Sequence, residues 1–425
     1  MIRFLGKGLL RDAGRSRMPV MVVAIGVALS VFMHAYVHGL MQDSIEMNAR
    51  MRYGHVKVCT RSFAENAAQM PADLSLLDVR ALKQQLTAHH PNLQWSDRIQ
   101  FAGLMDVPGM MGETRAQGPV IGMAVDFFST HSVEGERLNV QAALTEGRLP
   151  QQAGEMLLSA DFAEKLGVQI GDTLMFMGST QFGGLAYANF VLIGCVDFGV
   201  EVLDRGMMLA DLSDVRIAMD MEDAATEIVG FFEGGQYNDA AARRMQESFA
   251  ADFEVVAGDP YAPVLLRLKD QDDMGQLIDI SGAMGLLITF IFLLAMSLVL
   301  WNAGLLGGIR RYGEFGLRLA MGETKGHVYR SLQVESLLIG LLGSLIGTVL
   351  GLLFAWWMQE KGLNLGDSMQ NASMMLPTVI RARITPVDFY IGFIPGVFAT
   401  LIGSLLSGLG IFKRNTAQLF KELET

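Results

Sequence analysis

The chain has 425 residues, of which 51% are hydrophobic and 47 are glycine, so it is more apolar than an ordinary soluble protein and too large for one simple core. Its formal net charge of −11 is the sum of two unlike parts. Residues 41–282 carry 17 basic and 35 acidic side chains, a net charge of −18, while the rest carry 16 basic and 9 acidic ones, a net charge of +7. The acidic part argues against nucleic acid as a partner.

The chain begins with a basic segment, residues 1–17, in which scattered leucines predict a short amphipathic stretch on the cytoplasmic side. An apolar block follows from 18 to 40, and its length of about 20 residues is what a helix needs to cross a hydrocarbon core of about 30 Å. A cleaved signal peptide is the alternative. The block is longer than the apolar region of such a peptide and lacks a small-residue cleavage site, which favours a first membrane helix.

Three further apolar blocks predict membrane helices at 283–306, 333–358 and 387–412. Lysine and arginine are concentrated in residues 1–17 and in the loop 307–332, which places both in the cytoplasm by the positive-inside rule. The tail 413–425 then also lies in the cytoplasm. The acidic segment 41–282 and the loop 359–386 lie on the other side of the membrane.

The segment 41–282 alternates strand-like and helix-like patterns, which predicts an α+β domain of two subdomains. The first membrane helix continues beyond residue 40 as a helical stalk, and the pattern from 263 to 280 reads as a second helical stalk. Cys59 and Cys195 both lie in runs typical of buried strands. Two separate core thiols are expected, although a disulfide is possible in an oxidising compartment.

The run RRYGEFGLRLAMG, residues 310–322, is a charged, glycine-punctuated segment between two apolar blocks. A cytoplasmic segment of this composition suits mechanical coupling to a soluble partner. The chain itself has no GxxxxGK[ST] phosphate loop and no protease, hydrolase or metal motif. We therefore expect a non-catalytic subunit without a cofactor or a metal of its own.

Small residues spaced four apart let membrane helices approach closely, which predicts packing faces on the third and fourth helices. These residues are Gly343, Gly347, Gly351, Gly392 and Gly396. Glu335 is expected at the inner interface with a loop arginine as a candidate partner, since an unpaired carboxylate in lipid is costly. His34 and His38, four apart on one face, are expected to face a helix partner or water and not a metal.

The pattern RxxExGxxxAxG over residues 311–322, placed between the second and third helices, resembles the FtsX-like permease domain of four-helix mechanotransmission ABC transporters. The stretch EGRLPQQAGEMLLSADFAEKLGVQIGDTLMF resembles the MacB-like periplasmic core domain of the same family. The likeness covers nearly the whole chain and is strongest to lipoprotein-releasing permeases of the LolC and LolE kind. It implies a bacterial inner-membrane protein with its large domain in the periplasm.

The resemblance also implies partners. They are an ABC ATPase that binds ATP and Mg²⁺, a second permease protomer that is identical or related, membrane lipids, and a periplasmic lipoprotein carrier. The ATPase-coupling positions carried over to this chain are Arg311, Glu314, Gly316, Arg318, Ala320 and Gly322. A hairpin at 178–189 is the candidate carrier contact, through Phe182, Leu185 and Tyr187.

Extraction of lipoproteins from the inner membrane, driven by the ATPase partner, is therefore the leading functional hypothesis. Efflux of a drug, peptide or toxin, as in the MacB type, is one alternative. A regulator of a cell-wall hydrolase, as in FtsX, is the other. The cargo, the periplasmic partner and the choice between a homodimer and a heterodimer stay open at this point.

Overall fold

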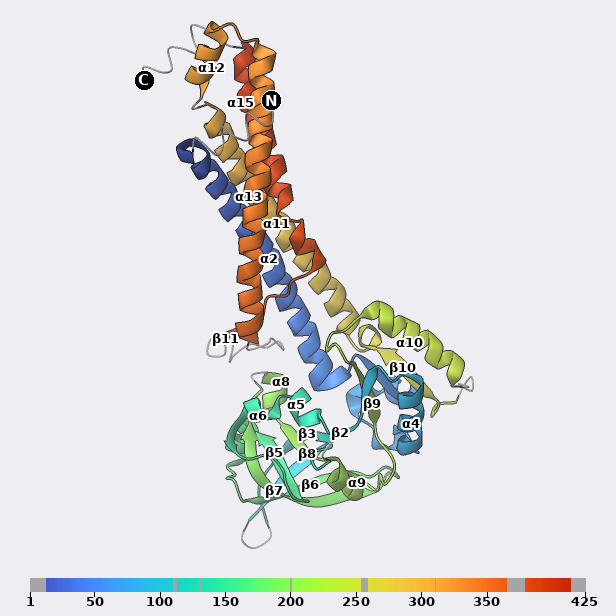
Figure 1. Cartoon of the computed structure of the whole chain (residues 1–425). Helices are drawn as coiled ribbons and strands as arrows, with labels where there is room; N and C mark the ends of the chain where they lie inside the picture. Colours follow the sequence, from blue (N-terminus) through green and yellow to red (C-terminus); the bar gives the residue numbers. More distant parts are fainter. Residues whose placement is uncertain are drawn as a thin grey trace. The chain divides into compact units, whose positions relative to one another are not determined.

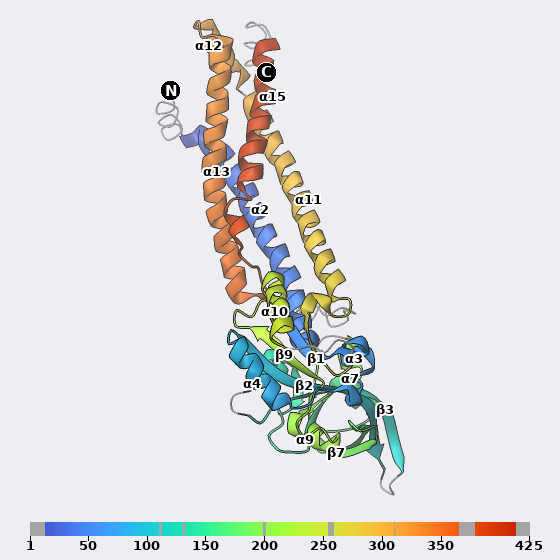
Figure 2. The same ribbon diagram turned by 90° about the vertical axis from the view of Figure 1, so that its right-hand side faces the viewer.

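The structure, a computed structural model, describes residues 13–109, 113–129, 132–198, 201–253, 259–309, 311–364 and 379–413. They form two compact units, shown in Figures 1 and 2. The helical unit takes the described parts of Met1–Gln42, Ile280–Asn364 and Val379–Thr425, and the outer-domain unit takes those of Asp43–Asp279. Most of the segment 1–17, most of the tail 413–425 and the middle of the loop 359–386 lie outside the described residues.

Among the described residues, four helical segments are long and apolar enough to cross a membrane, as predicted. They are α2 (Ala13–Asn48), α11 (Met274–Ile309), α13 (Lys325–Lys361) and the segment from Pro386 to Phe412. A short helix, α12 (Tyr312–Ala320), lies between α11 and α13 in the sequence. Two short strands, β11 (Leu363–Asn364) and β12 (Val379–Ile380), pair after α13.

The fourth apolar segment is irregular. It consists of a 3₁₀ turn, η5 (Pro386–Phe389), a π-helical turn, η6 (Ile394–Ala399), and α15 (Thr400–Lys413). Pro395 has no backbone N–H and cannot join a regular helical ladder, which accounts for the wide turn around it. The Thr400 hydroxyl donates a hydrogen bond to the Gly396 carbonyl oxygen at 2.7 Å, so this carbonyl is satisfied.

The outer-domain unit contains two sheets that share one long strand. After the π turn η1 (Ala49–Tyr53), the strands are β1 (Val56–Thr60), β2 (Leu93–Pro108), β3 (Thr114–Val125), β4 (Leu144–Gly147), β5 (Glu155–Ser159), β6 (Thr173–Ser179), β7 (Leu185–Val196), β8 (Met207–Asp211), β9 (Glu227–Phe232) and β10 (Pro263–Arg267). The first half of β2 pairs with β9, and its second half pairs with β3. The two subdomains predicted for this domain are therefore joined through a continuous strand.

One sheet is open and the other is closed. The open sheet runs β10-β1-β9-β2, with all pairs antiparallel. In the part of the chain that the structure describes, β2, β3, β8, β5, β7 and β6 each pair with the next, and β6 pairs back with β2. The second sheet is thus a small closed barrel, a form that leaves few exposed strand edges.

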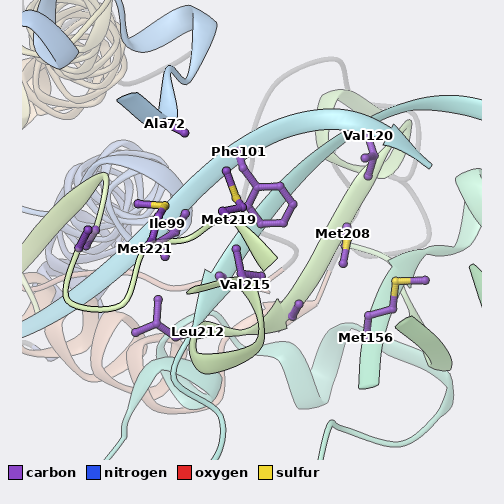
Figure 3. Close-up of a cluster of buried hydrophobic side chains, with 14 of the residues drawn as sticks. Ala72, Ile99, Phe101, Val120, Met156, Met208, Leu212, Val215, Met219 and Met221 are labelled. Carbon is purple, nitrogen blue, oxygen red and sulfur yellow. The ribbon is translucent and has the colours of Figure 1, made fainter. Parts of the chain in front are cut away.

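Helices and 3₁₀ turns connect the strands of this unit. They are α3 (Arg61–Glu65), η2 (Ala67–Gln69), η3 (Ala72–Leu74), α4 (Val79–His89), α5 (Glu134–Arg137), α6 (Val140–Ala143), α7 (Ala160–Leu166), α8 (Glu201–Asp204), α9 (Leu212–Ala218), α10 (Asp239–Asp252) and η4 (Leu268–Asp270). One continuous apolar cluster runs through both sheets, and Figure 3 shows Phe101, Val120, Met156 and Met208 within it. Methionine, which is unbranched and flexible, fills irregular gaps in such a core.

Residues 263–280 were expected to be helical throughout, and this expectation is wrong at its beginning. Pro263–Arg267 form the edge strand β10 on β1, with Val264 opposite Cys59 and Leu266 opposite Lys57. The helix α11 begins only at Met274. Cross-strand pairing supplies the partners for this edge segment and overrides its local helical pattern.

Candidate functional site

Helix α12 is held against its neighbours by one apolar face. Tyr312 and Phe315, three residues apart, are buried with Val328 and Leu332 of α13 and with Ile411 of α15. The Tyr312 hydroxyl donates a hydrogen bond to the Ser407 carbonyl oxygen at 2.7 Å. This packing fixes the position of α12 on the ends of two membrane-length helices.

Arg311 adds a polar clamp at the beginning of α12. Its Nη1 donates to Glu335 Oε1 of α13 at 2.7 Å, and its Nε lies 3.4 Å from Glu314 Oε2. Glu335 thus has a loop arginine as its partner, as expected. The structure brings Arg311 and Glu314 together, and Arg311 is also engaged with Glu335 of α13.

The other coupling candidates lie around the end of α12. Arg318 pairs with Glu323 at 2.7 Å, and Gly316 is buried. Ala320 is exposed, and Gly322 has a φ of +97°, a conformation that favours glycine and ends the helix. The turn that follows therefore depends on Gly322.

Sequence reasoning missed the most exposed apolar side chains of this region. Leu317 is 50% exposed and Met321 is 69% exposed. They are four residues apart, a spacing that places them on one side of a helix. That spacing was visible in the sequence and is the signal that could have identified them.

The glycines of α13 lie on α2. A Cβ added at Gly347 would come within 2.5 Å of the Ala24 carbonyl oxygen, and one at Gly351 within 2.7 Å of the Ala28 carbonyl oxygen. A Cβ at Gly343 would come within 2.6 Å of Val23 Cγ1. Only glycine permits this close approach of the two backbones.

The glycines of the fourth segment complete the same contact. A Cβ at Gly392 would meet Val27 Cγ1 at 2.6 Å, and one at Gly396 would meet Val27 Cγ2 at 2.7 Å. Gly396 also lies against Ser344 of α13. The structure therefore places all five packing candidates inside one bundle, with the valines of α2 at its centre.

The three residues of the candidate carrier contact lie on the hairpin between β6 and β7. Phe182 at its tip is 81% exposed, and Leu185 is 75% exposed. Gly183, with a φ of +76°, and a hydrogen bond from Gly184 N–H to the Thr180 hydroxyl shape the turn. Tyr187 lies across from Met177, which in turn lies across from Leu104 of β2. We call the exposed side chains Leu104, Phe182, Leu185 and Tyr187 the hairpin patch.

His34 has a partner that sequence reasoning did not find. Its Nδ1 lies 2.7 Å from Oδ1 of the fully buried Asp388 in η5. The other carboxylate oxygen accepts hydrogen bonds from the backbone N–H and the hydroxyl of Thr385. The Thr-x-x-Asp capping pattern at 385–388 was the available signal, because it predicts a turn that orients the aspartate. His34 thus faces another helical segment, one of the two options considered for it.

A second buried pair fixes the end of α2 to the outer-domain sheet. His55 Nε2 lies 2.8 Å from Glu46 Oε2, and His55 Nδ1 accepts a hydrogen bond from the Phe232 backbone N–H. The proton of the imidazole is therefore on Nε2, which donates to the carboxylate. Glu46 Oε1 also accepts a hydrogen bond from the Tyr237 backbone N–H.

A third buried group lies where β2 passes from one sheet to the other. The Glu134 carboxylate accepts a hydrogen bond from Arg98 Nε at 2.7 Å and is also paired with Arg137. Burial alone would raise the pKa of Glu134, but the two guanidinium groups outweigh it and the pKa is lowered. Arg137 also lies 4.1 Å from the centre of the Phe231 ring. These contacts tie α5 to the open sheet.

Cys59 in β1 and Cys195 in β7 are both free thiols. Burial raises the pKa of the Cys59 thiol to about 12, so it behaves as a small apolar side chain. Among the described residues, no group of three or more histidine, cysteine, aspartate or glutamate side chains is placed to hold a metal ion.

These features define a class of protein: a multi-pass membrane protein with a helical unit and an α/β outer domain inserted between its first and second apolar helices. The family profile for the MacB-like periplasmic core domain matches residues 20–279, and the profile for the FtsX-like permease C-terminal domain matches residues 286–416. The chain therefore belongs to the family of FtsX-like permeases that carry a MacB-like periplasmic core domain.

Relatives of known sequence agree with this assignment. The chain is 24% identical over 270 residues to the lipoprotein-releasing system transmembrane protein LolC of Haemophilus influenzae, covering 61% of each chain. It is 23% identical over 286 residues to an uncharacterized ABC transporter permease protein of Mycobacterium tuberculosis, covering 67% of this chain and 31% of that one. The matches thus span about three fifths of the first relative and one third of the second.

A solved structure, the periplasmic region of MacB from Actinobacillus actinomycetemcomitans, is also similar. It is 13% identical with a TM-score of 0.35, and the match covers 55% of this chain and 96% of that chain.

Proposed function

We propose that this chain couples ATP hydrolysis by a separate ATPase subunit to movement of its outer domain and thereby extracts lipoproteins from the bacterial inner membrane. The ATPase, and not this chain, binds ATP and Mg²⁺. The outer domain then lies in the periplasm. A second permease protomer, identical or related, completes the transporter.

The observation that carries the coupling proposal is the way in which α12 is attached to α13. Its buried face and the Arg311–Glu335 pair fasten it to α13, while Leu317 and Met321 stay exposed. An exposed apolar pair on a rigidly held helix is suited to enter a groove of a partner. Force on α12 would pass to α13 and, through the glycine contacts, to α2.

Two helices provide the proposed route to the outer domain. Helix α2 reaches Asn48, beyond the predicted end of the first span, and α11 begins at Met274, ahead of the second span. We propose that these extensions act as stalks. Glu46 at the end of α2 is bonded to His55, directly before β1, so the stalk residue and the sheet are coupled through buried hydrogen bonds.

The lipoprotein cargo is supported by the likeness to LolC, and the hairpin patch is the proposed contact for a periplasmic carrier. The test uses the complex with its ATPase in liposomes that contain a lipoprotein and a soluble carrier. ATP-dependent transfer of the lipoprotein to the carrier is expected. Transfer that does not depend on ATP, or ATP-driven export of a small molecule in its place, would overturn the cargo proposal.

The role of the hairpin patch is tested by comparing two variants. Phe182→Glu is expected to abolish transfer to the carrier while ATP hydrolysis continues. Ile217→Glu is the matched control, because Ile217 on α9 is 79% exposed but lies outside the hairpin patch. Equal loss of transfer in both variants would contradict a specific role for the hairpin.

A further inference from the structure

A cavity of about 540 Å³ lies within the outer-domain unit. Arg52 and Tyr53 of η1 form one side, and Asp272 and Asp273, which precede α11, form the other. Its volume lies within the range of about 300–1,000 Å³ that small-ligand sites occupy. Asn48 at the end of α2 and Met274 at the beginning of α11 also line it, and none of its residues belongs to the hairpin patch.

Hydrogen bonds within the wall leave an excess of acceptors. The Tyr53 hydroxyl donates to Asp272 Oδ2 at 3.0 Å, and Asn48 Nδ2 donates to the Ser44 carbonyl oxygen at 2.9 Å. The hydroxyl proton of Tyr53 and one of the two N–H groups of Asn48 are therefore used, while Asn48 Oδ1 and the phenol oxygen can still accept. Arg52 lies 3.6 Å from Asp272 and is the basic group of the wall.

Asp273 is the group that remains available. It directly precedes α11, yet within the described residues its carboxylate accepts no hydrogen bond from the helix and forms no ion pair. Two carboxylates and one guanidinium give the wall a negative excess, which favours a cation. An alkylammonium with its N–H donors would bind Asp273, Asn48 and Tyr53 together.

Other features of the wall indicate a specific site. The backbone of η1 is a π turn, a rare form that is frequently found at functional sites. Asp272 has a φ of +41°, which is unfavourable for a residue other than glycine. Met274 and Leu277 line the cavity with apolar surface and belong to the first turn of α11, a helix apolar enough to span the membrane.

We propose that this cavity binds the headgroup of an ethanolamine phospholipid. The primary ammonium would be held by Asp273, Asn48 and Tyr53, and the adjacent phosphate by Arg52. The apolar side chains Met274 and Leu277 would contact the methylene groups. A choline headgroup offers no N–H donor and cannot satisfy the same acceptors.

The test measures binding to the full-length chain after delipidation in detergent. Lysophosphatidylethanolamine and lysophosphatidylcholine with the same acyl chain are compared by the shift they cause in melting temperature and by native mass spectrometry. The ethanolamine lipid is expected to raise the melting temperature and to remain bound at concentrations at least tenfold lower than the choline lipid. Soluble phosphoethanolamine forms a third arm, and its binding with equal affinity would identify a free headgroup compound, not a lipid, as the ligand.

Asp273→Asn should remove the preference for ethanolamine without changing the melting temperature of the lipid-free protein. Asp279→Asn is the matched control, because Asp279 lies on the same helix but pairs with Lys269 at 2.6 Å outside the cavity. Equal binding of the two lysolipids, or an unchanged preference in Asp273→Asn, would overturn the proposal. The measurement uses neither ATPase nor cargo, so its outcome is independent of the transport proposal.

Discussion

Arg311 Nη1 lies 2.7 Å from Glu335 Oε1, so the residue that directly precedes α12 is attached to the N-terminal third of α13. Both side chains are partly exposed, and Arg311 also reaches Glu314 at 3.4 Å. The charged residues Arg311 and Glu335 thus position the helix, while Leu317 and Met321 present an exposed apolar surface. We therefore assign the positioning of α12 to Arg311 and Glu335, and the proposed contact with the ATPase to Leu317 and Met321. The two roles can be tested separately.

Replacing Glu335 with glutamine should uncouple the transporter without preventing its assembly. The change replaces a charge-assisted hydrogen bond with a weaker one to a neutral amide, at a cost of about 1 kcal/mol, so α12 should become more mobile relative to α13. We expect lower transport per ATP hydrolysed, measured as lipoprotein released against phosphate formed. Leu317→Glu is the comparison, because it should weaken binding of the ATPase itself in a pull-down assay. Loss of ATPase binding in Glu335→Gln would contradict the positioning role.

Much of the architecture could be predicted because it depends on local patterns. Four apolar blocks of spanning length correspond to four helical segments, and the glycines spaced four apart do lie at helix contacts. The closed barrel could not be predicted, because pairing of β6 back to β2 depends on residues about 70 positions apart in the chain. The strand β10 was missed for the same reason.

Some of the polar contacts could likewise be predicted from the sequence, and others could not. A partner for Glu335 could be expected, since a carboxylate near lipid needs one and the arginines are close in sequence. The pairing of His34 with Asp388 joins residues 354 positions apart, and no periodicity relates them. Similarly, the role of Arg98 depends on where β2 changes sheets, which only the assembled fold reveals.

Replacing His55 should destabilise the connection between α2 and the outer-domain sheet. His55→Ala leaves the buried Glu46 carboxylate without its side-chain donor, and loss of a hydrogen bond to a charged group typically costs about 1.5–3 kcal/mol. The expected result is a lower melting temperature of the full-length protein in detergent. Faster hydrogen exchange is also expected at the backbone amides of Phe232 and Tyr237, which bond to this pair.

Glu46→Gln changes the other member of this pair and should destabilise the protein less than His55→Ala does. The amide keeps one acceptor for the two donors that face it, the Tyr237 N–H and His55 Nε2–H, so one buried donor loses its partner. The cost should be about 1–3 kcal/mol. A larger effect of Glu46→Gln than of His55→Ala would show that the hydrogen-bond assignment is wrong.

Because Asp97 pairs with both Lys83 and Arg216, the stability of the outer domain should fall at acidic pH. Burial would raise the pKa of Asp97, but Lys83 at 2.5 Å and Arg216 at 2.6 Å outweigh it and hold the pKa below its usual value. A lowered pKa stabilises the fold above the ordinary aspartate pKa of about 3.9, and this stability is lost as the pH falls toward the lowered value.

The corresponding variant is Asp97→Asn, which removes the titrating group. It should lower stability by about 1.5–3 kcal/mol at neutral pH and flatten its decline below about pH 4. Urea unfolding of the full-length chain at pH 7 and pH 3.5, followed by hydrogen exchange at the backbone amides of β2 and β9, measures both effects. An equally steep decline in the variant would show that other carboxylates dominate.

The close backbone approach of α13 to α2 at Gly347 gives the last prediction. Gly347→Ala would place a methyl group 2.5 Å from the Ala24 carbonyl oxygen and 2.7 Å from Val27 Cβ, so α13 must move away from α2. Overpacking of this kind costs about 1–3 kcal/mol, and here backbone atoms cannot turn aside. A lower melting temperature in detergent is expected. Gly307→Ala is the control, because a Cβ at Gly307 of α11 meets no described atom within 4 Å. Equal stability of the two variants would mean that the backbones of α2 and α13 do not approach as closely as these glycines indicate.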